Sequence, residues 1–199
     1  MYDWRKMTAA QRTEVLRERK GRKLAWHAPP HWKYEGKVRF IVTAACYEHK
    51  RIIGHSIARM AEFESELLKA CHGFGVYVYA WCILLNHYHI LIQTEDIEGF
   101  RKTLGKVHGA TSFRWNGEEG MRGRKVWYQS FERPMKSDAH FWASVNYIHN
   151  NPVRHGYCQK WQDWSFSSAS SFLDRFGREK TVEIWNEYPT LDYGKGWDD

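Results

Sequence analysis

Two histidines separated by one residue are the first feature of the sequence that suggests chemistry. His87 and His89 lie in Asn86-His87-Tyr88-His89-Ile90-Leu91-Ile92, ahead of an apolar run. On a β-strand, residues i and i+2 point to the same face, so the two imidazoles would lie side by side while Tyr88 points the other way. Neutral imidazole is a common metal ligand. The pair is a weak signal by itself, and a metal site would need further ligands from elsewhere in the chain.

Tyr147 and Asn151 are the second candidate pair. They are four residues apart, one turn along the same face of a helix. A tyrosine hydroxyl can act as a covalent nucleophile, and an amide oxygen can complete a hard-metal shell beside two imidazoles. Two ordinary roles stay open at this point. Tyr147 would simply pack in the core, and Asn151 would end the helix because Pro152 follows it.

Seven elements are expected to position these residues. Apolar periodicity and β-forming composition predict a strand, a helix, two strands, a helix, a strand and a helix, in that order. This order predicts an α+β fold, a ferredoxin-like βαββαβ sheet with an added C-terminal helix that carries Tyr147. The expected strands are 38–47, 76–83, 87–94 and 126–131, and the expected helices are 56–72, 98–115 and 138–149.

Outside these elements, two segments of different composition predict the domain limits. Residues 1–37 form a basic extension, with a helix expected to begin at Thr8 and an aromatic, proline-containing stretch over 26–32. The residues between them, 38–172, are expected to form the main domain, and the acidic residues 173–199 a surface tail. The four cysteines include no Cys-x-x-Cys pair, which favours free thiols in a reducing cytosol. No apolar run approaches the roughly 18 residues of a membrane span, so we expect a cytoplasmic protein that does not enter membranes.

The charge balance favours a polyanionic partner. The formal net charge is +7 and the pI about 9.2, which fits nucleic acid best. Trp115, Trp127 and Tyr128 are candidates for stacking unpaired bases, although core packing is the commoner role of such residues. The basic residues expected to contact DNA phosphates belong to the second helix, the loop after it and the fourth strand: Arg101, Lys102, Lys106, Arg114, Arg122, Arg124, Lys125 and Arg133.

The histidine motif and a second segment, Tyr147-Ile148-His149-Asn150-Asn151-Pro152-Val153-Arg154-His155-Gly156-Tyr157, together resemble the single-tyrosine HUH transposases, named for His, a hydrophobic residue, His. The chain is most similar to the branch of REP-associated tyrosine transposases. Residues 127–129 (Trp-Tyr-Gln) and 164–168 (Trp-Ser-Phe-Ser-Ser) resemble further motifs of that family, and the resemblance covers about residues 38–172.

The resemblance implies roles for four residues. His87, His89 and Asn151 would hold Mg²⁺ or Mn²⁺, and Tyr147 would be the nucleophile that forms a 5′-phosphotyrosine link with single-stranded DNA beside a hairpin. A bacterial, nucleoid-associated enzyme, monomeric or homodimeric, is implied. Tyr88 departs from the aliphatic residue common at its position and is a rival nucleophile, and His149 is a rival ligand or base. Because imidazole ligands must be neutral, activity is expected to fall below about pH 6.5.

Two other functions stay open from the sequence. One is a hairpin-binding protein for DNA or RNA, domesticated from a transposase, that has lost catalysis. The other is a metal-dependent phosphodiesterase that uses water and in which Tyr147 is structural.

Overall fold

The computed structural model describes residues 8–11, 13–14, 17, 36–191 and 193, and its contacts divide the chain into two units, Met1–Tyr34 and Glu35–Asp199. In the first unit, Thr8 Oγ1 accepts a hydrogen bond from the Gln11 amide at 3.3 Å, as expected of a helix N-cap. The aromatic stretch over 26–32 lies outside the described residues.

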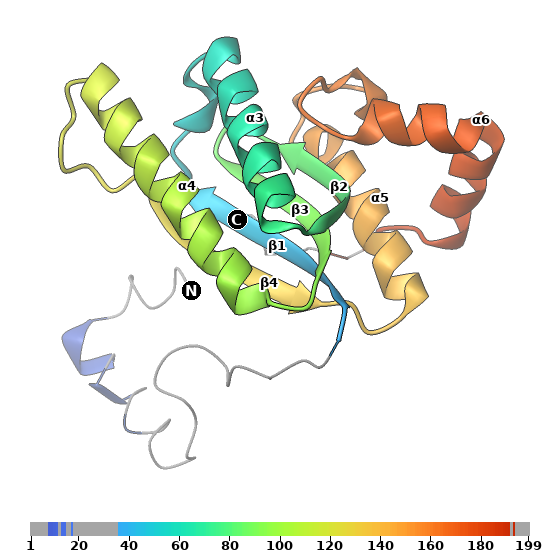
Figure 1. Ribbon diagram of the computed structural model, residues 1–199, viewed down its shortest axis with the longest axis horizontal. Coiled ribbons are helices and arrows are strands. Elements are labelled where there is room, and N and C mark those ends of the chain that lie inside the picture. The colour runs from blue at the N-terminus through green and yellow to red at the C-terminus, as the bar shows by residue number, and fades with distance from the viewer. Residues whose placement is uncertain (1–7, 12, 15–16, 18–35, 192, 194–199) are drawn as a thin grey trace. The chain divides into compact units, whose positions relative to one another are not determined.

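The second unit is built on one antiparallel sheet with the strand order β2-β3-β1-β4 (Figure 1). Two helices, α3 and α4, cover one face of the sheet, and α5 crosses the other face with α6 beside it. This is the predicted α+β arrangement, which is confirmed. The bounds are β1 (Val38–Cys46), α3 (Ile57–Phe74), β2 (Tyr77–Ile83), β3 (His87–Thr94), α4 (Ile97–Glu118), β4 (Trp127–Pro134), α5 (Asp138–Arg154) and α6 (Ala169–Glu187), with short 3-10 helices η1 (Tyr47–His49), η2 (Ile53–His55) and η3 (Trp161–Asp163).

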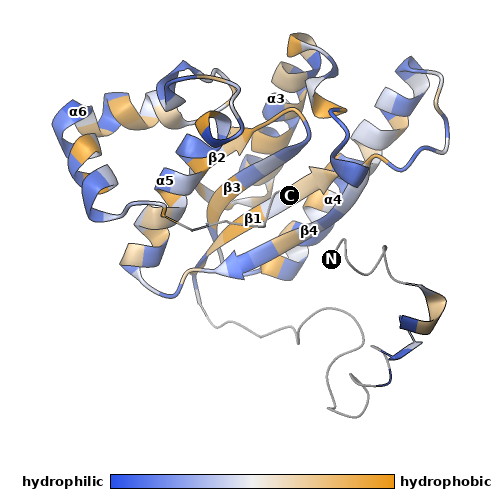
Figure 2. Cartoon of the chain, turned by 180° about the vertical axis from the view of Figure 1, so that it is seen from behind, coloured by the Kyte–Doolittle hydropathy of each residue, from blue (hydrophilic) through white to orange (hydrophobic). Residues whose placement is uncertain are grey.

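Strand β3 is central and is buried on both faces. Tyr88, Ile90 and Ile92 alternate with residues that point to the α5 face, among them His87 and His89. Helices cover both faces, so polar side chains on this strand must find partners inside the protein. Figure 2 shows the molecule from the side of α5, with α5 and α6 beside β2 and β3.

Helix α5 is longer than predicted. The expected stop before Pro152 is wrong, because the helix runs on to Arg154. A proline removes one N–H bond to the carbonyl four residues earlier. Here it lies in the last turn, and the amides of His155 and Gly156 still bond to the carbonyls of Asn151 and Val153, at 3.0 and 2.9 Å. Asn151 and Pro152 are buried within this turn. Because the helix includes Asn151, this residue lies one turn after Tyr147 on the same face.

Helix α6 spans the limit that we expected between residues 172 and 173. It is kinked at Gly177, where φ is 73°, and both Phe172 and Ile184 are buried in the cluster that packs on α5. All four cysteines are free. None of the described helices has the length and apolar character to cross a membrane.

Candidate active site

The turn between β2 and β3 sets the start of the histidine strand. The Cys46 amide donates to the Asn86 carbonyl at 2.6 Å, and the Gly54 amide donates to the Leu85 carbonyl at 2.8 Å. A Cβ atom at Gly54 would lie 2.9 Å from the Leu85 Cα, so only glycine allows η2 to approach this closely. These two hydrogen bonds fix the backbone at Leu85 and Asn86, directly before His87.

Both imidazoles are buried, and each uses Nδ1 for a contact within the protein. Their ring centroids are 5.0 Å apart. His87 Nδ1 lies 2.8 Å from Asn86 Oδ1, and His89 Nδ1 lies 2.7 Å from Thr43 Oγ1. These contacts orient the rings so that both Nε2 atoms are left to face the α5 side, the arrangement common among metal-binding histidines.

The tautomer of His87 follows from its neighbour. Asn86 Nδ2 donates to the His49 carbonyl at 3.0 Å, which fixes Oδ1 as the amide atom that faces His87. An amide oxygen only accepts, so His87 Nδ1 carries the proton. In the neutral ring, Nε2 then presents a lone pair.

Helix α5 brings Tyr147 and Asn151 onto these rings. The Tyr147 ring centroid lies 5.1 Å from that of His89, and Asn151 Oδ1 lies 3.2 Å from His87 Nε2. All four side chains are buried, with exposed fractions of 0–1%. The four residues singled out in the sequence therefore meet at one place, between β3 and α5.

The donor set fits a hard divalent cation. Two acceptors, the Nε2 lone pair of His87 and Asn151 Oδ1, face each other at 3.2 Å, and the buried Asn151 Nδ2 has no hydrogen-bond partner among the described residues. Adjacent ligands of an octahedral Mg²⁺ at 2.0–2.1 Å are about 3 Å apart. No group of three or more His, Cys, Asp or Glu side chains in the described part of the chain could hold a metal, so this site depends on the amide oxygen.

The two rivals of these residues point elsewhere. Tyr88 extends to the α3 and α4 side, where its hydroxyl lies 3.0 Å from His108 Nε2. His149 is buried beside α6, and its Nε2 lies 2.8 Å from Ser168 Oγ. Burial lowers the pKa of His149 to about 3, so the ring is neutral at ordinary pH. Ser168 also accepts from the Trp81 amide at 2.9 Å, which gives the second serine of the Ser-Ser motif a structural role.

The structure adds Arg154 to the candidate site. Its guanidinium carbon lies 5.7 Å from the centroid of the Tyr147 ring, and it donates to the Tyr193 carbonyl at 3.1 Å. The Tyr193 ring packs on Tyr147, with centroids 5.4 Å apart. Arg154 follows Tyr147 by seven residues, or two helical turns. This spacing places both residues on the same face of α5, provided that the helix continues past Pro152.

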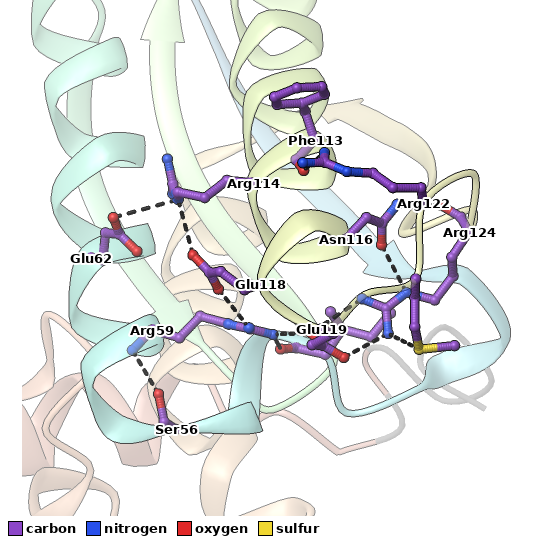
Figure 3. Close-up of polar contacts among 12 residues, drawn as sticks. Ser56, Arg59, Glu62, Phe113, Arg114, Asn116, Glu118, Glu119, Arg122 and Arg124 are labelled. Carbon is purple, nitrogen blue, oxygen red and sulfur yellow. Dashed lines mark hydrogen bonds and ion pairs between the residues drawn. The ribbon is translucent and has the colours of Figure 1, made fainter.

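Most of the residues predicted to bind DNA lie on the opposite face. Helix α4 packs on the Tyr88 side of the sheet, and Figure 3 shows Arg114 of this helix and Arg122 and Arg124 of the loop after it in polar contacts within the protein. Arg114 pairs with Glu66 at 2.9 Å. Arg124 pairs with Glu119 at 2.8 Å, and Arg122 donates to the Phe113 carbonyl at 2.7 Å. Their contact with DNA stays a prediction, at a distance from the candidate site.

The other predicted basic residues differ in position. Arg101 pairs with Glu132 at 3.2 Å, Lys125 Nζ lies 4.6 Å from the Tyr47 ring centroid, and Lys102 and Lys106 are exposed on α4. Arg133 stands opposite Ile41 in the β1–β4 pair, which places it on the α5 face with the histidines.

The prediction that Trp115 and Trp127 stack on unpaired bases is wrong. Trp115 is fully buried and Trp127 is 7% exposed, so both pack in the core between α3, α4 and the sheet. Tyr128 is half-buried on β4.

Comparisons of the sequence and of the fold relate this chain to known proteins. Over 139 residues, 63% of this chain and 73% of the relative, the sequence is 28% identical to a Haemophilus influenzae protein assigned as a REP-associated tyrosine transposase. The fold is similar to the solved structure of a REP-associated tyrosine transposase bound to a REP hairpin, with a TM-score of 0.60, 17% identity, and coverage of 75% of this chain and 86% of that one. Residues 33–151 match the family described as "Transposase IS200 like", a region that contains His87, His89, Tyr147 and Asn151. The chain belongs to the IS200-like transposase family.

Proposed function

We propose that this protein is a metal-dependent enzyme that nicks single-stranded DNA beside a hairpin-forming repeat and rejoins it through a 5′-phosphotyrosine intermediate on Tyr147. The observation that carries the proposal is the meeting of Tyr147 and Asn151 from α5 with His87 and His89 from β3. Family membership supports DNA cleavage as the reaction class. The hairpin substrate is inferred from the solved relative, which is bound to one.

The reaction is a transesterification. The Tyr147 oxygen attacks the scissile phosphorus and loses its proton, the new P–O bond joins the tyrosine to the 5′ side of the break, and the leaving 3′ oxygen takes up a proton. Phosphodiester bonds are exchanged one for one, so rejoining needs no ATP. A cation held by His87, His89 and Asn151 would polarise the phosphate and stabilise the charge that develops on it.

The surrounding residues act by orienting these groups. Asn86 holds His87 in the tautomer whose Nε2 lone pair faces Asn151, and Thr43 holds the ring of His89. Arg154, beside the Tyr147 ring, supplies a positive charge next to the phosphate position.

The test is formation of a covalent protein–DNA adduct on a hairpin oligonucleotide with a single-stranded extension, in the presence of Mg²⁺ or Mn²⁺. The Tyr147→Phe variant should form no adduct. The matched control is Tyr88→Phe, which removes the neighbouring hydroxyl on the other face of the sheet and should leave adduct formation in place. Adduct at the wild-type level in Tyr147→Phe would refute the nucleophile assignment.

Two further outcomes select the other functions. Cleavage without any tyrosyl adduct indicates a phosphodiesterase that uses water. Tight hairpin binding without cleavage in any divalent ion indicates a binding protein that has lost catalysis.

A further inference from the structure

A cavity of about 410 Å³ lies on the other flank of α5, away from the histidines. It is bounded by β2, by the N-terminal half of α5 and by the first turns of α6. The residues that matter to its chemistry are four aromatic side chains and two arginines: Tyr79, Trp81, Trp142, Phe176, Arg39 and Arg175.

The rings form an open aromatic surface. Trp142 stands edge-to-face with Phe176, at 6.1 Å and 86° between centroids and planes, and Tyr79 meets Phe141 at 4.9 Å and 83°. Trp142, Phe176 and Tyr79 are only half-buried, so part of each ring faces the cavity. Such surfaces bind planar ligands by stacking, and every nucleobase offers a planar face.

The charge around the cavity is positive. Arg175 is exposed, lies 5.6 Å from the Phe176 centroid, and makes no ion pair with a carboxylate among the residues that the structure describes. Arg39 lies 4.8 Å from the Phe141 centroid and pairs with the exposed Asp138. Among the residues that the structure describes, no acidic side chain lines the cavity. A planar ligand that also carries negative charge, such as a nucleotide, fits both features.

A larger cavity at the same edge of the sheet lacks this combination. It measures about 700 Å³ and is lined by Glu95 and Asp96 as well as Lys37. Two carboxylates repel phosphate, so the smaller cavity is the better site for a nucleotide.

Its position relative to the candidate active site also fits DNA. Trp142 precedes Tyr147 by five residues on α5, a rise of about 7.5 Å. The two side chains point to different flanks of the helix, Tyr147 toward His89 and Trp142 toward Phe176. A volume of about 410 Å³ is at the small end of ligand pockets, enough for a nucleotide and too small for a duplex.

We propose that this cavity binds one unpaired nucleotide of the DNA substrate, with the base stacked beside Trp142 and its phosphate near Arg175. The choice of DNA as ligand rests on the proposed function. The cavity would hold the single strand at a fixed distance from Tyr147 and favour an unpaired flank over a paired one.

The test measures the affinity of the full chain for a hairpin with single-stranded extensions, in a Tyr147→Phe background that prevents cleavage. Each unpaired position in turn carries an abasic site. One position should weaken binding by about 5-fold to 150-fold, the range expected for one stacked base. In Trp142→Leu, the unmodified hairpin should bind more weakly and the abasic site at that position should have no further effect. Trp185→Leu, the same change on α6 but outside the cavity, should keep the full abasic effect.

A second variant guards against misfolding of Trp142→Leu. Arg175 is exposed, so Arg175→Gln leaves the core intact, and it should lower the slope of log affinity against log salt by about one. The proposal is overturned if the abasic effect persists in a folded Trp142→Leu variant, if no unpaired position shows an effect, or if Arg175→Gln leaves the salt slope unchanged.

This result is separable from the proposed function. Tyrosyl adduct in the wild-type chain with an unchanged abasic effect in Trp142→Leu removes the cavity and leaves the enzyme. A base-specific effect at Trp142 without any adduct supports the cavity and removes the nicking activity.

Discussion

His108 provides a quantitative test of the packing behind the histidine motif. Its Nε2 lies 3.0 Å from the Tyr88 hydroxyl, and its ring stacks on Trp127 with centroids 4.3 Å apart and planes at 18°. Burial lowers the pKa of His108 to about 4. A protonated ring would have to carry its charge in this apolar stack. We therefore expect acid to unfold the protein partly through this residue.

The direction and size follow from proton linkage. In the unfolded chain His108 is protonated near its ordinary pKa of about 6.5, whereas in the folded protein it is protonated only near pH 4. The contribution of neutral His108 to the unfolding free energy is therefore fully present above pH 6.5 and is lost as the pH falls toward 4. Each pH unit in this window is equivalent to about 1.4 kcal/mol, so lowering the pH from 7 to 5 should reduce the unfolding free energy by about 2 kcal/mol through His108 alone.

Urea unfolding of the wild-type chain and of His108→Gln, at several values between pH 5 and pH 7, isolates this contribution. Glutamine keeps an acceptor for Tyr88 and does not titrate, so the loss of stability between these pH values should be smaller by about 2 kcal/mol. His149 has a lowered pKa as well, but it contributes equally to both proteins. Glu119 titrates below this window, because Arg124 and Arg59 lower its pKa to about 2. Equal pH dependence in both proteins would refute the reasoning.

Three further predictions concern the site and the ion-pair cluster of Figure 3. Mn²⁺ at about 100 times its dissociation constant should stabilise the wild-type chain by about 2.7 kcal/mol, a rise of about 5–10 °C in melting temperature that is absent in His87→Ala; an equal rise in His87→Ala would contradict the ligand assignment. Asn86→Ala should weaken Mn²⁺ binding by about 10-fold to 100-fold in titration calorimetry, since His87 loses the partner that fixes its tautomer; unchanged affinity would show that Asn86 has no such role. Arg59→Met should lower the unfolding free energy by about 2–3 kcal/mol, because the buried guanidinium bonds to Glu118 and Glu119 at 2.8 and 2.6 Å; a urea midpoint like that of the wild type would contradict this.

Local periodicity determined the elements of the fold. The apolar run within residues 87–94 and the apolar spacing along α3 are local properties, and they predicted the strand and the helix to within two residues. The end of α5 was missed because the rule for proline applies to a helix in isolation. Asn151 and Pro152 are both buried, and Asn151 contacts His87 of β3; this burial outweighs that preference, and only the tertiary packing supplies it.

The sequence also named the residues of the candidate site. The types and spacing of His87, His89, Tyr147 and Asn151 indicated ligands and a nucleophile before their positions were known. It could not decide which basic residues lie near them, because the side of the sheet that a helix covers depends on the chain connections. Arg114 was predicted to contact DNA and is paired with carboxylates on the far face, whereas Arg154 was passed over and lies beside Tyr147.

Residue types and their spacing thus determined the elements and the chemistry available to this protein. The tertiary structure decided which groups share a face. Asn151 Oδ1 lies 3.2 Å from His87 Nε2, whereas Tyr88 contacts His108 on the other face of the sheet. An aromatic cavity lies beside Trp142. The physical reason is that these contacts join residues distant in sequence, whose approach depends on the packing of helices on a sheet and not on any local preference.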